Sequence, residues 1–118
     1  MNLHALTRLL PLAAMLACAP ALADETLDGE DAAYIDWSWR HCGTVSTAKE
    51  HALADAANAK GGAQFHADYL KHLHEIADVD RTPAQVASLC SQIEDRYGPE
   101  ATIMPGLISA KEREGQSP

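Results

Sequence analysis

The sequence predicts an all-α fold, a small bundle of about four helices closed by a disulfide between Cys42 and Cys90. Three observations lead to this prediction. Apolar residues recur at three- and four-residue steps in several segments, which is the spacing of one helical face. Capping residues precede these segments, and glycine or proline ends them. One segment alternates as a strand would, but no second segment is visible as its partner.

Residues 1–23 resemble a secretory signal peptide. Arg8 gives a weakly positive start, and a short apolar run covers residues 9–17. Ala21-Leu22-Ala23 is the small-x-small pattern that signal peptidase cuts, which predicts Asp24 as the mature N-terminus. The apolar run is too short to span a membrane. We therefore expect a periplasmic or secreted protein of 95 residues, 23 fewer than the 118 of the full chain.

Export would determine which of the three cysteines can form a disulfide. Residues 15–18 also resemble a lipobox, in which Cys18 would be lipidated and become the first residue of an anchored lipoprotein. Cys18 is thus either removed or lipidated, which leaves Cys42 and Cys90 as a pair in an oxidising compartment. Their disulfide would close a long loop, worth about 4 kcal/mol. The alternative is two reduced, buried thiols.

The mature chain begins with two segments of different character. Residues 24–31 carry five acids in eight positions and predict a solvated, acidic N-terminal arm. A helical domain should follow over residues 32–110. Its first segment, Ala32–Cys42, fits either a helix or a strand, and the helix is favoured. Trp37 and Trp39 then point to opposite sides, so one belongs to the core and the other is at least partly exposed.

Two further helices should follow, separated by a glycine pair. A capping box from Thr47 to Glu50 begins an alanine-rich helix that reaches Ala59, and residues 60–62 end it at Gly61-Gly62. The next helix is expected over residues 63–78. Its inward face carries Phe65, Tyr69, Leu73 and Ile76.

The clearest segment runs from Thr82 to Pro99. Thr82 caps the helix, Pro83 fits its first position, and Gln85 completes a capping box. Gly98 and Pro99 end it. The inward stripe of this helix is Val86, Leu89, Cys90, Ile93 and Tyr97. A short packed turn or half-helix is expected around residues 103–108, and residues 111–118 predict a flexible tail.

Composition restricts the function. Losing Arg8 with the leader changes the formal net charge from −8 to −9, which argues against nucleic acid and anionic membranes as partners. A cationic protein partner fits this charge. The histidines are spread so that neighbouring ones diverge, and no Cys-x-x-Cys, phosphate-binding loop or His-Glu-x-x-His motif is present. We therefore expect no metal, no cofactor and no enzymatic activity. The alternative for the histidines is a role in sensing pH, since imidazole groups change charge between about pH 5 and 7.

The tryptophans carry the leading functional hypothesis. An exposed aromatic rimmed by acids is where interface energy concentrates, and the candidates are Trp37 or Trp39 with Asp36 and Asp31, or Glu30, nearby. They predict a protein-binding module, such as an immunity or inhibitor protein against an envelope-acting toxin or hydrolase. The alternative is that both tryptophans only pack the core. A lipidated Cys18 would instead favour an accessory lipoprotein subunit.

One family resemblance adds a further hypothesis. Residues 76–79 and 82–86, leading to Cys90, resemble the segment before the second cysteine of the HdeA-type periplasmic acid chaperones. Trp39, shortly before Cys42, and the spacing of the two cysteines are also similar to that family. The resemblance implies a short exported helical protein with one disulfide that protects clients under acid stress.

Overall fold

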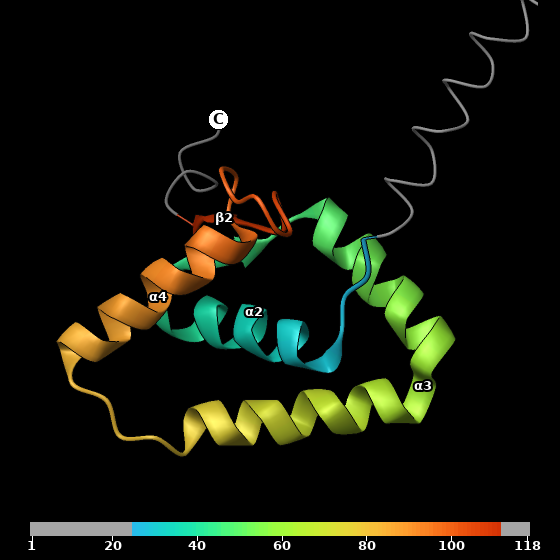
Figure 1. The fold of residues 1–118 in the computed structure, drawn as a ribbon, viewed down its shortest axis with the longest axis horizontal. Coiled ribbons are helices and arrows are strands. Elements are labelled where there is room, and N and C mark those ends of the chain that lie inside the picture. The colour runs from blue at the N-terminus through green and yellow to red at the C-terminus, as the bar shows by residue number, and fades with distance from the viewer. Residues whose placement is uncertain (1–24, 112–118) are drawn as a thin grey trace, which may run out of the picture.

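The computed structural model describes residues 25–111 of the 118. The predicted signal peptide, its cleavage site, Cys18 and residues 112–118 lie outside the described residues. The elements, in order, are α2 (Gly29–His41), β1 (Thr44–Ser46), α3 (Ala48–Ala77), α4 (Pro83–Tyr97) and β2 (Ile108–Ala110). Figure 1 shows α2 lying inside the angle of a bent α3, with α4 on the other side of α2.

The predicted count of about four helices is not matched, because the described residues contain three helical elements. The two helices predicted on either side of the glycine pair form one element, α3, which bends at Gly62. The predicted break at the glycine pair is present at Gly62, which takes φ 49° and ψ −124°, a non-helical conformation that a side chain would strain. The chain therefore changes direction at one residue rather than through a loop.

The all-α prediction is also wrong in one detail, since β1 and β2 form a small antiparallel sheet. Thr44 pairs with Ala110, and Ser46 pairs with Ile108. The Lys111 amide donates to the Gly43 carbonyl at 2.7 Å, next to this ladder. Strands of three residues are too short to show a period of two, so no sequence pattern predicted them.

Helix α2 begins earlier than the sequence predicted. Asp28 caps it, and Asp28 and Asp31 form a reciprocal capping box. Leu27 is 5% exposed and Asp31 is 4% exposed. The prediction of a solvated arm over residues 24–31 is therefore wrong for its second half, where the chain is already folded and partly buried.

Helix α2 packs closely against the second half of α3. A Cβ at Gly29 would lie 2.5 Å from Asp68 Cβ and 2.6 Å from the Tyr69 amide nitrogen. Only glycine allows this approach of the two backbones. The buried side chains of the core come from the segment before α2, from all three helices and from the C-terminal turn: Leu27, Ala33, Ile35, Trp37, Ile76, Ile93, Tyr97, Met104, Leu107 and Ile108.

The structure confirms the predicted bounds of helix α4 and the row of apolar residues that was expected to face the core. Thr82 is the N-cap, Pro83 opens the helix, and the Gln85 capping box is present. Ile93 and Tyr97 are buried, while Val86, Leu89 and Cys90 are half-buried against the core. The half-buried positions lie toward the N-terminal half of α4, so that half is the less covered one.

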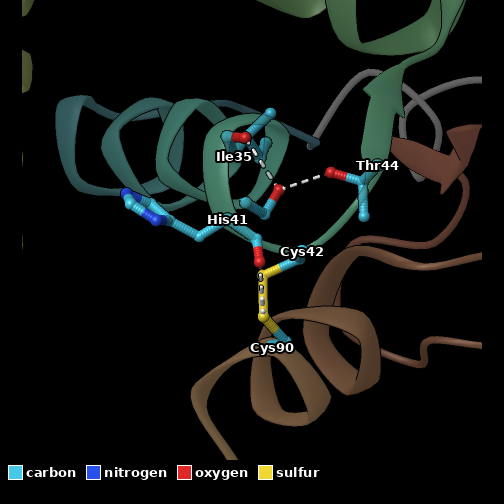
Figure 2. The surroundings of a disulfide bond; sticks show 6 residues. Ile35, His41, Cys42, Thr44 and Cys90 are labelled. Carbon is cyan, nitrogen blue, oxygen red and sulfur yellow. Dashed lines mark hydrogen bonds between the residues drawn. A yellow bond between two sulfur atoms is a disulfide. The ribbon is translucent and has the colours of Figure 1, made fainter. Parts of the chain in front are cut away.

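The predicted disulfide joins Cys42, at the C-terminal cap of α2, to Cys90 in the middle of α4 (Figure 2). The Cα atoms of the two cysteines are 5.5 Å apart. Nearby, the buried Ser38 hydroxyl donates to the Ile35 carbonyl at 2.8 Å and lies 2.8 Å from the Thr44 hydroxyl. The end of α2 is thus tied to both α4 and β1.

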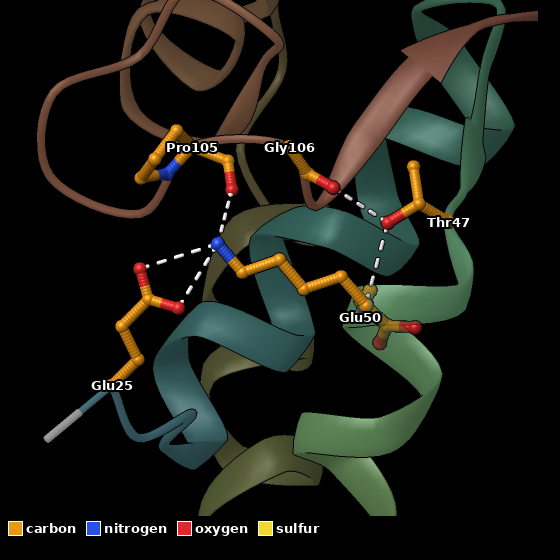
Figure 3. A network of polar contacts seen from close by, with 6 residues as sticks. Glu25, Thr47, Glu50, Pro105 and Gly106 are labelled. Atoms are coloured by element: carbon orange, nitrogen blue, oxygen red, sulfur yellow. Dashed lines mark hydrogen bonds and ion pairs between the residues drawn. The ribbon is translucent and has the colours of Figure 1, made fainter. Parts of the chain in front are cut away.

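The predicted turn before β2 is present, and polar contacts hold it over the start of α3 (Figure 3). Met104, Leu107 and Ile108 are packed as expected, but Ile103 is exposed. The Thr47 hydroxyl donates to the Gly106 carbonyl at 2.6 Å. Lys49 Nζ donates to the Pro105 carbonyl at 2.8 Å and lies 2.9 Å from a Glu25 carboxylate oxygen. One lysine therefore links α3, the C-terminal turn and the segment before α2.

Candidate functional site

The two tryptophans of α2 lie in different environments, as the helix spacing predicted. Trp37 is 3% exposed, with its ring centroid 4.6 Å from that of His41 and the Arg81 guanidinium 5.3 Å from it. Trp39 is 48% exposed. Trp37 therefore serves the core, which rules it out as a surface anchor, and only Trp39 presents a large indole surface to a partner.

Trp39 borders a shallow hollow of about 360 Å³ between α2 and α3. We call this surface the Trp39 face. Its lining residues are Ala32, Ile35, Asp36, Trp39, Ser46, Glu50, His51 and Tyr69. Two cations also lie near the indole ring: the Arg40 guanidinium at 5.9 Å and the Lys111 ammonium at 5.3 Å from the ring centroid. The predicted pair of Trp39 and Asp36 thus does share one surface.

The acids of the Trp39 face already have partners within the chain. Asp36 accepts a hydrogen bond from the Tyr69 hydroxyl at 3.1 Å and lies 3.4 Å from Arg40 Nε. Burial, together with the Asp36 charge, raises the pKa of the Tyr69 hydroxyl. Glu50 is 9% exposed, and its burial raises the pKa of its carboxyl group. The face is therefore mixed in charge rather than acidic.

Asp31, predicted as part of the binding rim, lies elsewhere. It is buried and does not line the hollow beside Trp39. Its carboxylate accepts a hydrogen bond from the Tyr97 hydroxyl at 2.5 Å, and Arg96 Nε is 3.7 Å away. Burial raises the pKa of Asp31, although the hydrogen bond from Tyr97 lowers it in part. Asp31 is thus a structural residue, and its capping-box spacing with Asp28 is the sequence signal that could have identified it.

The histidines of the described residues do not form a metal centre. His72 Nδ1 lies 3.6 Å from Glu30 and 3.4 Å from Glu75, and His51 Nε2 lies 3.8 Å from Glu50. Between residues 25 and 111, no three histidines, cysteines or acids converge on a position for one ion. Over the same residues, no helix combines the length and apolar character that a membrane span requires.

No family model, no curated protein and no solved structure matches this chain.

Proposed function

We propose that the protein is an exported protein-binding module, such as an immunity or inhibitor protein of the cell envelope, and that Trp39 anchors its binding surface. The observation that carries the proposal is that Trp39 is 48% exposed beside a hollow. Trp39 lies near the C-terminal end of α2, which the disulfide holds in place. Large aromatic side chains contribute most of the energy in many protein interfaces. Their burial by a partner also costs little side-chain entropy.

The surroundings of Trp39 favour a rigid binding surface. The disulfide holds the C-terminal end of α2, and the hydroxyl pair of Ser38 and Thr44 connects α2 to β1. A surface that is ordered before binding loses less conformational entropy in the complex. The internal pairing of Asp36 means that a partner need not supply a cation at this face.

The test is affinity capture from the envelope fraction of the producing bacterium, followed by calorimetry with each captured protein after purification. Trp39→Ala should lower the affinity for the true partner by about 30-fold or more, the loss typical of a central aromatic. Leu70→Ala is the matched control, since it truncates another exposed apolar side chain, 40% exposed, on α3. The Leu70→Ala variant should bind the partner with the same affinity as the wild-type protein.

Two outcomes would contradict the proposal. One is that no captured protein distinguishes Trp39→Ala from the wild type. The other is that both variants lose affinity equally, which would indicate non-specific apolar adhesion. Thermal unfolding of both variants must match the wild type, so that a loss of binding reports on the surface and not on the fold.

A second candidate, an HdeA-like acid chaperone, is favoured by the thin cover of the helices. Phe65, Leu73 and Leu89 are only half-buried, so limited opening would expose them while the disulfide kept the chain together. The two buried carboxyl groups act against this. Because the folded-state pKa values of Asp31 and Glu50 are raised, their protonation favours the folded state as pH falls. We therefore place the binding module first.

One pH series separates the two candidates. Tryptophan fluorescence and hydrophobic-dye binding are followed from neutral pH to about pH 2, with an aggregation-prone client added at each pH. A chaperone opens and protects the client only in acid. A binding module protects nothing at any pH, and client protection in acid would remove it from first place.

A further inference from the structure

A second groove lies on the other side of α2 from the Trp39 face. It has a volume of about 390 Å³ and runs between the first half of α2 and the second half of α4. Its α2 residues, Glu30 and Tyr34, are four positions apart and therefore share one helical face. Trp39 and Asp36 project about half a turn away from them. The two surfaces share no lining residue.

The groove is apolar inside and has an exposed apolar wall. Tyr34 and Leu89 are half-buried and Ile93 is buried, so they form its floor. Ile103, on the turn after α4, also lines the groove and is 61% exposed, the highest exposure among the large exposed apolar side chains of residues 25–111. A partner that covered Ile103 would remove this apolar surface from water.

The turn that carries Ile103 is held in place by the backbone. The Met104 amide donates to the Arg96 carbonyl at 3.2 Å, and the Leu107 amide donates to the Tyr97 carbonyl at 2.9 Å. The Gly106 amide donates to the Gly98 carbonyl at 2.9 Å. Ile103 is thus presented to solvent by an ordered turn, rather than by a segment without bonds to the rest of the fold.

The charges at the rim have an acidic surplus. Glu30 and Asp95 are exposed there, and Glu30 also lies 3.6 Å from His72 Nδ1 on α3. Arg96 is the single Lys or Arg among the lining residues, and it is already engaged, 3.7 Å from Asp31 and 5.6 Å from the Tyr97 ring. Charge complementarity therefore selects a cationic occupant, and the negative net charge of the whole chain would steer it.

We propose that this groove is a docking site for a cationic amphipathic helix of a protein partner. Apolar side chains at helical spacing would cover Ile103 and the floor, and flanking lysine or arginine residues would pair with Glu30 and Asp95. A groove between two helices is a frequent receptor for such a segment. The site goes beyond the Trp39 face and does not depend on it, so either surface can fail without the other.

The test uses a synthetic amidated helix made only of leucine and lysine, with the leucines on one face, and full-length mature protein in calorimetry. A second probe replaces every lysine with glutamate. The lysine probe should bind, and the glutamate probe should not. Amide chemical shifts should move at Tyr34, Leu89 and Ile93, while the Trp39 indole signal stays in place. Equal binding of both probes would overturn the proposal.

Paired variants then separate the groove from general charge attraction. Ile103→Ser should weaken binding of the lysine probe by about tenfold, whereas Leu70→Ser should not weaken it. Asp95→Asn should weaken binding about threefold and reduce its salt dependence. Asp55→Asn removes the same charge from an exposed position on α3 outside the groove and should leave affinity unchanged.

Three results would contradict the proposed docking site. If Asp55→Asn weakens binding as much as Asp95→Asn does, the probe responds to net charge and the docking site is refuted. If Ile103→Ser and Leu70→Ser are equivalent, the apolar wall has no role and the proposal is equally refuted. Trp39→Ala should bind the lysine probe like the wild type. Loss of binding in that variant would place the probe on the other face.

Discussion

Tyr97→Phe tests the buried pair that joins the two ends of the fold. The Tyr97 hydroxyl donates to Asp31 across 66 positions of sequence, and the two side chains are 1% and 4% exposed. A buried hydrogen bond to a charged group is worth about 2 kcal/mol, and phenylalanine leaves almost no cavity. We therefore expect the free energy of unfolding to fall by about 2 kcal/mol near neutral pH, measured by urea denaturation with tryptophan fluorescence.

The size of this loss should depend on pH. The Tyr97 hydrogen bond lowers the folded-state pKa of Asp31, against the larger raising effect of burial. Without the hydroxyl, that pKa rises further, so the variant is penalised most when Asp31 is ionised. As pH falls through the folded-state pKa, Asp31 becomes neutral and the difference from the wild type should shrink to about 1 kcal/mol.

The control and the refuting result are both defined. Tyr34→Phe removes the hydroxyl of a half-buried tyrosine on α2, the helix that carries Asp31, and should change stability by less than about 0.5 kcal/mol. A Tyr97→Phe loss that is equal in acid and at neutral pH would show that Asp31 is not a charged acceptor there. A loss no larger than that of the control would show that the hydrogen bond contributes nothing.

Three further predictions concern the Cys42–Cys90 disulfide, the close contact between α2 and α3, and the N-terminus of the mature chain. Cys90→Ser should lower the free energy of unfolding by about 4 kcal/mol, and mass spectrometry after alkylation without reductant should find no labelled thiol in the wild type; two labelled thiols would contradict the disulfide. Gly29→Ala should cost about 2 kcal/mol or more in urea denaturation, because its Cβ would meet Asp68 Cβ at 2.5 Å; an unchanged midpoint would refute the close contact. Intact-mass analysis should find a chain beginning at Asp24, and a lipidated Cys18 would favour the accessory lipoprotein instead.

Local signals account for the parts of the fold that the sequence predicted well. The Thr82 cap, Pro83 and the Gln85 capping box act within one turn of helix, so α4 could be placed without knowing its neighbours. The same holds for the opposite directions of Trp37 and Trp39, which follow from helix geometry once α2 is helical. The disulfide was predictable because only two of the three cysteines lie outside the predicted leader.

Contacts between distant residues account for the rest. The β1–β2 pairing joins segments on either side of both long helices, and strands of three residues carry no pattern that announces a partner. Gly61-Gly62 indicated an end of helix, and Gly62 does interrupt α3, but the packing of both halves of α3 around α2 makes this break a bend without a loop. The binding rim was misassigned for the same reason, since the acidity of Asp31 indicated solvent while Tyr97 and Arg96 hold it inside.

The helical character of the chain, the caps at Thr47 and Thr82 and the candidate pair of Cys42 and Cys90 could be predicted from sequence, because each depends on residues within a turn or two or on simple counting. Tertiary structure alone decided which acids are exposed and which hydrophobic residues remain uncovered. In the folded chain Asp31 and Glu50 are buried, and Asp36 is hydrogen-bonded to Tyr69. Ile103 faces solvent beside a groove whose rim is acidic. Burial and charge pairing are properties of surfaces brought together by folding, so they become readable only when the helices are in place.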